Sequence, residues 1–257
     1  MIELVVHGAA GRMGRAVALA AQGATDLRVV AHVDPSSNLA SDAGAWTTDL
    51  ASALRPGQVV VEFSGPSGAR HAAELCAAKG AALVSGSTGL GADEEAALQA
   101  AATRVAVFRA SNFSIGVAVL RRALLAALEA APNTWDIEIV ERHHRMKQDS
   151  PSGTALTLAD DALGARGLTR DALVNGRAGA VGMRPAAEIG LHAVRGGTWV
   201  GDHQVLLAGE GEWIELRHVA QDRAAFAHGA LSAARFLSTA APGMYTMHDL
   251  VRGPGRT

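Results

Sequence analysis

The chain opens with a short apolar run, a glycine-rich turn and a helix-like segment, and this order restricts the fold more than any other feature. Residues 2–7 (IELVVH) predict a buried strand, GAAGRMG follows, and residues 15–23 (RAVALAAQG) have the pattern of a helix. Glycines in such a turn let the backbone approach a pyrophosphate, while the helix N-terminus faces its negative charge. The first residues therefore predict the start of a dinucleotide-binding domain.

The turn reads G-x-x-G-x-x-G and not the usual G-x-G-x-x-G, so on its own it is also compatible with a simple tight turn. Asp34 strengthens the prediction, because it ends the next apolar run twenty residues after Gly14. A carboxylate at that place can hydrogen-bond a ribose hydroxyl. It favours NADH, whereas Arg12 and Arg15 could offset its charge, so NADH and NADPH both remain candidates, with NADH preferred.

Strand-like and helix-like runs then alternate along the first half of the chain. We expect strands at 28–34, 59–65, 81–86 and 104–110, and helices at 67–80, 93–102 and 115–131. This alternation predicts a parallel sheet covered on both faces, with ligands beyond the carboxyl ends of the strands. Small polar loops at 63–65, 86–89 and 111–113 follow three of these strands and are either ordinary turns or parts of the ligand site.

The composition excludes several classes of protein. With a net charge of −2 and no basic stripe, we expect no nucleic-acid partner. No run approaches 18 apolar residues and the start lacks a signal peptide, so we expect no membrane segment and a cytoplasmic location. The single cysteine, Cys76, excludes an intramolecular disulfide and a cysteine zinc cluster, and we interpret it as a packed side chain.

The stretch from 138 to 155, EIVERHHRMKQDSPSGTA, gathers groups that bind anions or move protons. His143, His144, Lys147 and Asp149 lie within seven residues, and the following PSGT is typical of a helix start, capped by Ser152 or Thr154. A helix N-terminus and a lysine both attract anions, and histidine titrates near neutral pH. The stretch predicts a site that holds and protonates a small acidic substrate, although a solvated histidine pair would share parts of this pattern.

This spacing resembles the signature of the 4-hydroxy-tetrahydrodipicolinate reductase family, long called dihydrodipicolinate reductases. The family pattern is E, I or V, any, E, any, H, three residues, K, any, D, any, P-S-G-T-A, and the chain fills every fixed position. The glycine turn, the GSTG segment at 86–89 and the ASNFS segment at 110–114 also resemble family segments, with Ser87 in place of a threonine. The resemblance covers essentially the whole chain.

The resemblance implies an activity and a role for individual residues. The enzyme would reduce 4-hydroxy-2,3,4,5-tetrahydrodipicolinate to tetrahydrodipicolinate with loss of water, using NADH or NADPH, in diaminopimelate and lysine biosynthesis. His143 would donate and accept a proton, and Lys147 would be a second donor. The small dicarboxylate substrate would be bound by His144, Ser152, Gly153 and Thr154. The cofactor would be bound by Gly8, Ala9, Ala10, Gly11, Arg12, Met13, Asp34, Gly86, Ser87, Thr88, Ala110, Ser111, Asn112 and Phe113.

The second half predicts a smaller α+β domain. A strand at 135–141, a helix at 152–167 and a long aperiodic loop at 168–190 precede three runs that we expect to be antiparallel strands, LHAVRGG, WVGDHQVLLAG and EWIELRHVA. Together they predict a four-stranded sheet, which by resemblance builds a homotetramer. We assign Arg195-Gly-Gly and the segment 200–203 structural or interface roles. The roles of Arg177 and Arg184 in the loop stay open between substrate contact and solvated surface.

The predicted fold class is therefore α/β, with an N-terminal Rossmann-like doubly wound parallel sheet and a smaller α+β domain. The dinucleotide-binding domain would comprise 1–113 and 223–257, where the helix at 223–238 returns, and the substrate-binding and tetramerisation domain would comprise 114–222. The alternative function is another two-domain NAD(P)-dependent reductase of a small keto or imino acid. A dinucleotide sensor without turnover is a third reading. We expect no metal, because adjacent histidines do not form an i, i+4 ligand pair.

Overall fold

The computed structural model describes residues 1–35 and 45–252 of the chain. The chain divides into two compact units, one comprising Met1–Ile115 with the segment from Arg223 onward, and the other Gly116–Asp222. Part of the predicted range 223–257, its last five residues, lies outside the described residues. No helix in the described ranges is long and apolar enough to cross a membrane.

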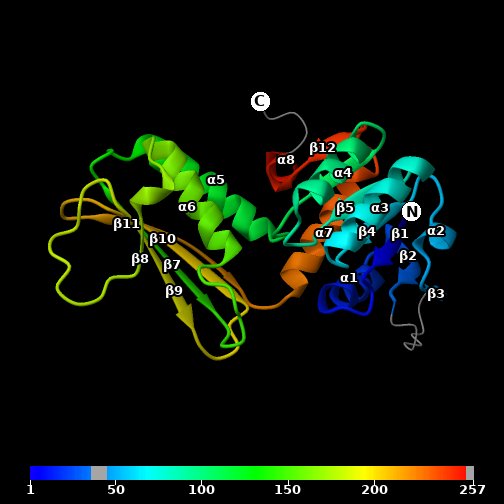
Figure 1. Cartoon of the computed structure of the whole chain (residues 1–257), viewed down its shortest axis with the longest axis horizontal. Coiled ribbons are helices and arrows are strands. Elements are labelled where there is room, and N and C mark those ends of the chain that lie inside the picture. Colours follow the sequence, from blue (N-terminus) through cyan, green and yellow to red (C-terminus); the bar gives the residue numbers. More distant parts are fainter. Residues whose placement is uncertain (36–44, 253–257) are drawn as a thin grey trace. The chain divides into compact units, whose positions relative to one another are not determined.

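The first unit is a seven-stranded parallel sheet with helices on both faces (Figure 1), as predicted. Its strands are β1 (Ile2–His7), β2 (Leu27–Val33), β3 (Ala45–Thr47), β4 (Val59–Glu62), β5 (Ala82–Ser85), β6 (Ala106–Arg109) and β12 (Gly243–Tyr245). Its helices are α1 (Arg12–Gln22), α2 (Leu50–Ala53), α3 (Pro66–Lys79), α4 (Ala92–Ala102), α7 (Ala224–Leu237) and α8 (Met247–Arg252).

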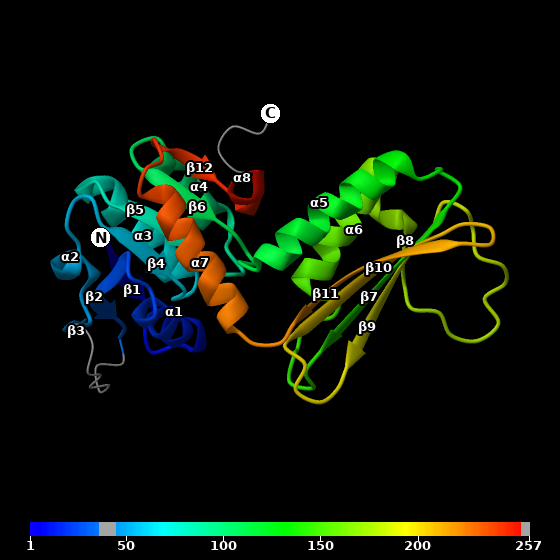
Figure 2. The same ribbon diagram turned by 180° about the vertical axis from the view of Figure 1, so that it is seen from behind.

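The strand order of this sheet, β12-β6-β5-β4-β1-β2-β3, changes direction between β1 and β4. Helices α1 and α7 lie together on one face and α3 and α4 on the other (Figure 2). The core between α3, α4 and the sheet is built mainly from Ala, Val and Leu, and Cys76 is fully buried within it, as predicted. In open parallel sheets the crevice at such a reversal point is where ligands bind, so the fold directs attention to the carboxyl ends of β1 and β4.

Strands β3 and β12 and helices α2 and α8 were not predicted from the sequence. Both strands have three residues and lie at the two edges of the sheet. Such short elements carry no measurable periodicity, and their pairing depends on the strand beside them. The missed elements therefore extend the sheet without changing its class.

The second unit is a mixed sheet with helices α5 (Ile115–Ala130) and α6 (Gly153–Arg166) on one face. Its strands, in the order β11-β10-β7-β9-β8, are β7 (Asp136–His143), β8 (Leu173–Asn175), β9 (Ile189–Arg195), β10 (Gly201–Ala208) and β11 (Trp213–Ala220), and a 3₁₀ turn (Arg170–Ala172) precedes β8. Alternate residues of β7 are buried, which matches the predicted half-buried strand. Of these buried residues, Ile137 and Ile139 pack with α5 and α6 into one apolar core.

Two details of the predicted second sheet were wrong. The sheet has five strands and not four, because residues 173–175 of the predicted loop pair with β9. In addition, β9 runs parallel to β7, whereas β10 and β11 pair antiparallel. The reason is that α6 lies between β7 and the later strands in the chain, and such a crossover returns the next strand in the same direction.

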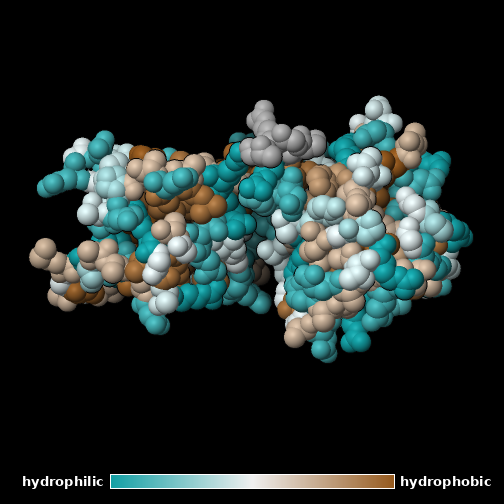
Figure 3. All heavy atoms as spheres, turned by 90° about the horizontal axis from the view of Figure 1, so that it is seen from above, coloured by the Kyte–Doolittle hydropathy of each residue, from teal (hydrophilic) through white to brown (hydrophobic). Residues whose placement is uncertain are grey.

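The segment 176–188 belongs to the predicted long loop and is fixed to β7 by an ion-pair network, which gives Arg177 and Arg184 a structural role. Arg177 and Arg184 both contact the Glu138 carboxylate, at 2.9 and 3.0 Å, and Arg184 also binds Asp136 at 2.6 Å. Glu138 lies on the sheet face opposite the helices, and a side chain at Gly190 would collide with it. Hydrophobic and polar side chains are interspersed over the surface of both units (Figure 3).

Candidate functional site

The glycine turn at the end of β1 has the close packing that a dinucleotide cradle requires. Gly8 has a φ of +81°, and a Cβ there would lie 2.6 Å from the carbonyl oxygen of Phe63. A Cβ at Gly14 would lie 2.7 Å from Cα of Ala9 and would also meet the Gly8 carbonyl. The glycines at both positions are therefore required by the backbone, the first by its conformation and the second by helix packing.

The helix that follows this turn begins without a side-chain cap. Gly11 is the N-cap residue of α1 and makes no side-chain hydrogen bond to the first turn. Asp34, at the end of β2, accepts a hydrogen bond from the Ala10 backbone N–H at 3.0 Å, so its carboxylate is fixed beside the turn. Arg12 is exposed at the start of the helix. A dinucleotide fits these residues, because uncapped N–H groups suit a pyrophosphate and the nearby carboxylate suits a ribose.

Glu62 organises the loops at the carboxyl ends of β4 and β5, and the sequence analysis missed it. Its side chain is fully buried and accepts hydrogen bonds from Ser64 N and Oγ at 2.6 and 2.8 Å and from Ser85 Oγ at 2.9 Å. Ser87 Oγ binds the same carboxylate and accepts a hydrogen bond from Gly65 N at 2.7 Å. One carboxylate thus joins two loops. A glutamate at the end of an apolar strand run was the available signal.

The other residues predicted for the cofactor lie in these loops and in the next one. Ser87 is buried, whereas Thr88 and Ser111 are exposed. Asn112 Oδ1 accepts a hydrogen bond from Ser114 N at 2.8 Å, which shapes the turn before α5. The ring of Phe113 packs edge-on against the ring of Phe63, with centroids 5.7 Å apart, so it is part of the wall beneath the loops. These loops follow β5 and β6 in the first unit.

The second unit holds a compact polar cluster around Glu141. The cluster lies on the same face of the sheet as the apolar core, at the other end of that face. The Glu141 side chain is fully buried, and its Oε2 lies 2.5 Å from Nδ1 of His143. Arg195 on β9 donates to both carboxylate oxygens, at 2.7 and 2.8 Å, and Ser152 N donates to Oε1 at 2.9 Å. Burial by itself would raise the pKa of Glu141, but the bonds from His143, Arg195 and Ser152 outweigh it and lower the pKa to about 2.

His203 on β10 completes this cluster, although the sequence analysis gave its segment a structural or interface role. Its ring packs edge-on against the ring of His143, with centroids 5.1 Å apart, and its Nε2 lies 3.2 Å from Ser152 Oγ. Burial and the neighbouring His143 lower the pKa of His203 to about 4. Arg195 and His203 are 54 and 62 residues away from Glu141 in the chain, so only strand pairing identifies them as neighbours.

The start of α6 lies beside this cluster. Ser152 is the N-cap residue, as one of the two predicted alternatives, and its Oγ accepts a hydrogen bond from Ala155 N at 3.2 Å. Because the Ser152 side chain is buried and already bonded, it fixes the helix start. Gly153 is exposed and Thr154 half-buried in the first turn. The N–H groups of this turn are the ones that a helix offers to an anion.

Lys147 and His144 lie in the loop between β7 and α6. Lys147 Nζ contacts both carboxylate oxygens of Asp149 at 2.7 and 2.8 Å, and this ion pair lowers the pKa of Asp149. The loop is held by backbone bonds from His144 N to Trp199 O and from Gly196 N to His143 O, at 2.9 and 3.0 Å. The predicted proton donors and substrate contacts are therefore brought together in one unit, and the predicted cofactor contacts in the other.

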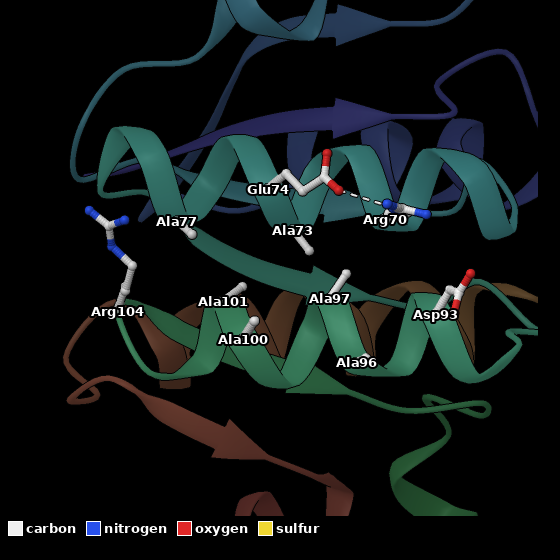
Figure 4. A pocket seen from close by; sticks show the side chains of 10 residues that line it. All are labelled: Arg70, Ala73, Glu74, Ala77, Asp93, Ala96, Ala97, Ala100, Ala101 and Arg104. Carbon is white, nitrogen blue, oxygen red and sulfur yellow. Dashed lines mark hydrogen bonds and ion pairs between the residues drawn. The ribbon is translucent and has the colours of Figure 1, made fainter.

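A separate groove on the first unit, between α3 and α4, does not involve these residues (Figure 4). Its volume is about 620 Å³, and alanines form its floor, with Arg70, Glu74, Asp93 and Arg104 along its sides. Arg70 and Glu74 are paired with each other at 3.0 Å, four residues apart on α3. None of the residues predicted for the site lines this groove, so we do not include it in the candidate site.

Comparisons with known proteins show matches along nearly the whole chain. The family models "Dihydrodipicolinate reductase, N-terminus" and "Dihydrodipicolinate reductase, C-terminus" match residues 2–113 and 116–251. Curated relatives named 4-hydroxy-tetrahydrodipicolinate reductase include those of Thermomicrobium roseum, 45% identical over 98% of this chain and 100% of the relative, and Anaeromyxobacter sp., 41% identical over 98% of both.

Solved structures agree at the level of the fold. A dipicolinate-bound dihydrodipicolinate reductase from Paenisporosarcina sp. has a TM-score of 0.78 and 23% identity, and it covers 96% of this chain and 97% of that one. A diaminopimelate (DAP) dehydrogenase from C. glutamicum has a TM-score of 0.57 and 14% identity, with coverage of 96% and 93%.

Proposed function

This chain belongs to the dihydrodipicolinate reductase family, and from that premise we propose that it reduces 4-hydroxy-2,3,4,5-tetrahydrodipicolinate to tetrahydrodipicolinate, with loss of water, in diaminopimelate and lysine biosynthesis. The balanced reaction consumes one NAD(P)H and one proton and releases NAD(P)⁺ and water. The observation that supports this proposal best is the Glu141–His143–Arg195 cluster beside the start of α6, because it combines a proton-transfer group with an anion site.

The substrate carries two carboxylates, and the groups around α6 suit one of them. Gly153 and Thr154 lie in the first turn of the helix, the part of a helix that suits an anion. Lys147 contributes a positive charge, and His144 lies in the same loop. In this proposal the carboxylate takes the place of Asp149 as the partner of Lys147, which requires that exposed ion pair to open.

His143 is the proposed proton donor and acceptor, and Lys147 the second donor. The reaction needs a proton at the ring and a proton for the departing hydroxyl, which leaves as water. Histidine is suited to this work because both of its protonation states are accessible near neutral pH. The His143 ring is mostly buried and is held between Glu141 and His203, so its position is fixed before substrate binds.

The nicotinamide cofactor, when bound, supplies the hydride. Gly8, Gly14 and the uncapped start of α1 would hold its pyrophosphate, and Asp34 its adenosine ribose. The loops joined by Glu62 would shape the nicotinamide end. We propose NADH as the preferred cofactor and NADPH as a usable one, since Asp34 would repel a 2′-phosphate and Arg12 would attract it.

The sheet of the second unit also supports an assembly with further copies of the chain. Its face opposite α5 and α6 carries exposed apolar side chains, including Val194, Trp213 and Val219, which are 38, 69 and 50% exposed. Exposed apolar side chains on one open sheet face are typical of an interface. We propose a cytoplasmic homotetramer built through this face, and light scattering after size-exclusion chromatography measures the number of copies.

The direct test of the function follows NADH absorbance with substrate made in the cuvette by dihydrodipicolinate synthase. We expect rapid oxidation of NADH that depends on the synthase, on its substrates and on this protein. The protein with Glu74→Gln, in the α3–α4 groove, is a matched control that should retain activity. If neither NADH nor NADPH is oxidised, while another small keto or imino acid supports oxidation, the alternative reductase function is correct.

A further inference from the structure

The hydrogen bonds around Glu141 determine which nitrogen of His143 can exchange a proton. We propose that Glu141 is a positioning residue that holds the neutral imidazole of His143 in the Nδ1–H form, so that Nε2 is the nitrogen that gives a proton to the substrate or takes one from it. This inference rests on the proposed function and extends it from a residue to a single atom.

Three donor groups surround the Glu141 carboxylate. Arg195 Nη1 lies 2.7 Å from Oε2 and Arg195 Nη2 lies 2.8 Å from Oε1, and Ser152 N lies 2.9 Å from Oε1. Each of these three groups can only donate a hydrogen bond. The carboxylate must therefore accept on both of its oxygens.

The remaining contact joins Oε2 of Glu141 and Nδ1 of His143, which lie 2.5 Å apart. Because the pKa of Glu141 is lowered to about 2, the carboxyl group has no proton to donate near neutral pH. At this distance one of the two atoms must carry a hydrogen. It can only be Nδ1, so the neutral ring carries its lone pair on Nε2.

Nε2, the other ring nitrogen of His143, lies beside Gly201 on β10, where a Cβ would lie 3.3 Å from it. Glycine therefore leaves free the space that any other residue would fill. The neighbouring ring of His203 presents its Cε1 to the same position, 3.6 Å from that Cβ.

Arg195 makes this arrangement compatible with proton transfer in both directions. An ionised Glu141 without a cation would leave an uncompensated buried charge beside the ring. The guanidinium is bonded to both carboxylate oxygens and also to the backbone oxygen of Asp149, at 2.7 Å, so it compensates the charge and fixes the catalytic loop. His203, whose ring packs against that of His143, has a pKa of about 4 and adds no positive charge near neutral pH.

The test reads the tautomer directly by ¹⁵N–¹H correlation NMR of the full-length protein with labelled histidine. The His143 signals are assigned by their loss in His143→Asn. At a pH where the ring is neutral, we expect Nδ1 to show the shift of a protonated nitrogen and Nε2 that of an unprotonated one. The opposite pattern in the wild-type protein would overturn the inference, and this measurement requires neither substrate nor turnover.

Glu141→Gln provides the functional part of the test. A glutamine amide at this position must direct its NH₂ group either toward His143 or toward Ser152 N and Arg195, which are themselves donors. The orientation toward His143 requires an unprotonated Nδ1, so the Nε2–H form should become populated. We expect kcat to fall about 10²-fold or more, with KM changed less than about threefold. Glu138→Gln is the matched control. Glu138 lies on the same strand and, like Glu141, binds a histidine and arginine, here two arginines, but its side chain is on the opposite face of the sheet.

The possible outcomes separate the inference from the function on which it rests. An Nδ1–H ring in the wild-type protein together with full turnover in His143→Asn leaves the tautomer assignment valid and refutes the role of His143. An unchanged His143 tautomer and unchanged kcat in folded Glu141→Gln refute the positioning role. If Glu141→Gln does not fold, the wild-type NMR pattern decides by itself.

Discussion

Arg195→Met tests whether the buried carboxylate of Glu141 depends on its guanidinium partner. The substitution keeps much of the aliphatic volume but removes two charge-assisted hydrogen bonds from a side chain that is 0% exposed. Breaking a buried pair by removing one partner typically costs 3–5 kcal/mol. Because Arg195 itself is 20% exposed, we expect the lower end, about 3 kcal/mol of unfolding free energy at pH 7.

The same pair determines how the unfolding free energy of the two proteins changes as the pH falls. The folded-state pKa of Glu141, about 2, lies below its value of 4.5 in the unfolded chain. A lowered folded pKa contributes stability above pH 4.5 that is lost as the pH falls toward 2, in total about 3 kcal/mol, of which about 2 kcal/mol is lost by pH 3. In Arg195→Met the carboxyl pKa returns toward 4.5, so most of this loss disappears. The difference in unfolding free energy between wild type and variant should decrease from about 3 kcal/mol at pH 7 to about 1 kcal/mol at pH 3.

Urea unfolding followed by tryptophan fluorescence measures both quantities. Trp135, Trp199 and Trp213 lie in the second unit, so three of the four tryptophans report on the region that is changed. Both proteins are compared at one protein concentration, at pH 7 and pH 3. Arg177→Met is the control, because Glu138 keeps Arg184 and His192 as partners.

Equal stability of wild type and Arg195→Met at pH 7 would refute the reasoning. So would a gap that stays constant between pH 7 and pH 3, since it would mean that the guanidinium does not lower the pKa of Glu141.

Four further predictions concern activity. Lys147→Ala should lower kcat about 10²-fold or more, the usual scale for a positioned proton donor, and wild-type turnover would remove Lys147 from the mechanism. Pyridine-2,6-dicarboxylate should compete with the substrate in initial-rate kinetics, and failure of every dicarboxylate to inhibit would count against the anion site. The ratio kcat/KM should be higher with NADH than with NADPH, by about tenfold if Asp34 adds about 1.4 kcal/mol of repulsion, and a strong NADPH preference would contradict this. Gly201→Ala, whose methyl group would lie 3.3 Å from His143 Nε2, should lower kcat/KM about tenfold, whereas Gly164→Ala, with open space around it, should not.

The class of fold followed from the sequence because the deciding patterns are local. The first strand and the long helices α5 and α6 were predicted almost to the residue, whereas α1 begins at Arg12, three residues before the predicted start. Their periodicity and end signals, such as Ser152 before α6 and Pro132 after α5, act over a few residues. The three-residue strands β3, β8 and β12 have no such local pattern, and they form only because a neighbouring strand offers them backbone partners.

The candidate site divides in the same way. His143, Lys147 and the start of α6 lie in one stretch of sequence, and Glu141 binds both His143 and the backbone N–H of Ser152. Three residues, Glu62, Arg195 and His203, were not identified as site residues. Their roles depend on contacts that form only where the ends of different strands come together. A charged residue within an otherwise apolar strand was the one local signal, and it marks Glu62.

The cluster around Glu141 depends on how three strands are aligned. Glu141 lies opposite His203, and His143 opposite Arg195, while neighbouring residues such as Arg142 point to the other face of the sheet. One residue inserted between Ile139 and Glu141 would turn the carboxylate and the imidazole to that other face. The loop from 144 to 151 lies outside the strands, and it carries Lys147 and leads to Ser152. The alignment of Glu141, His143, Arg195 and His203 therefore depends on the strands, whereas the position of Lys147 depends on the loop.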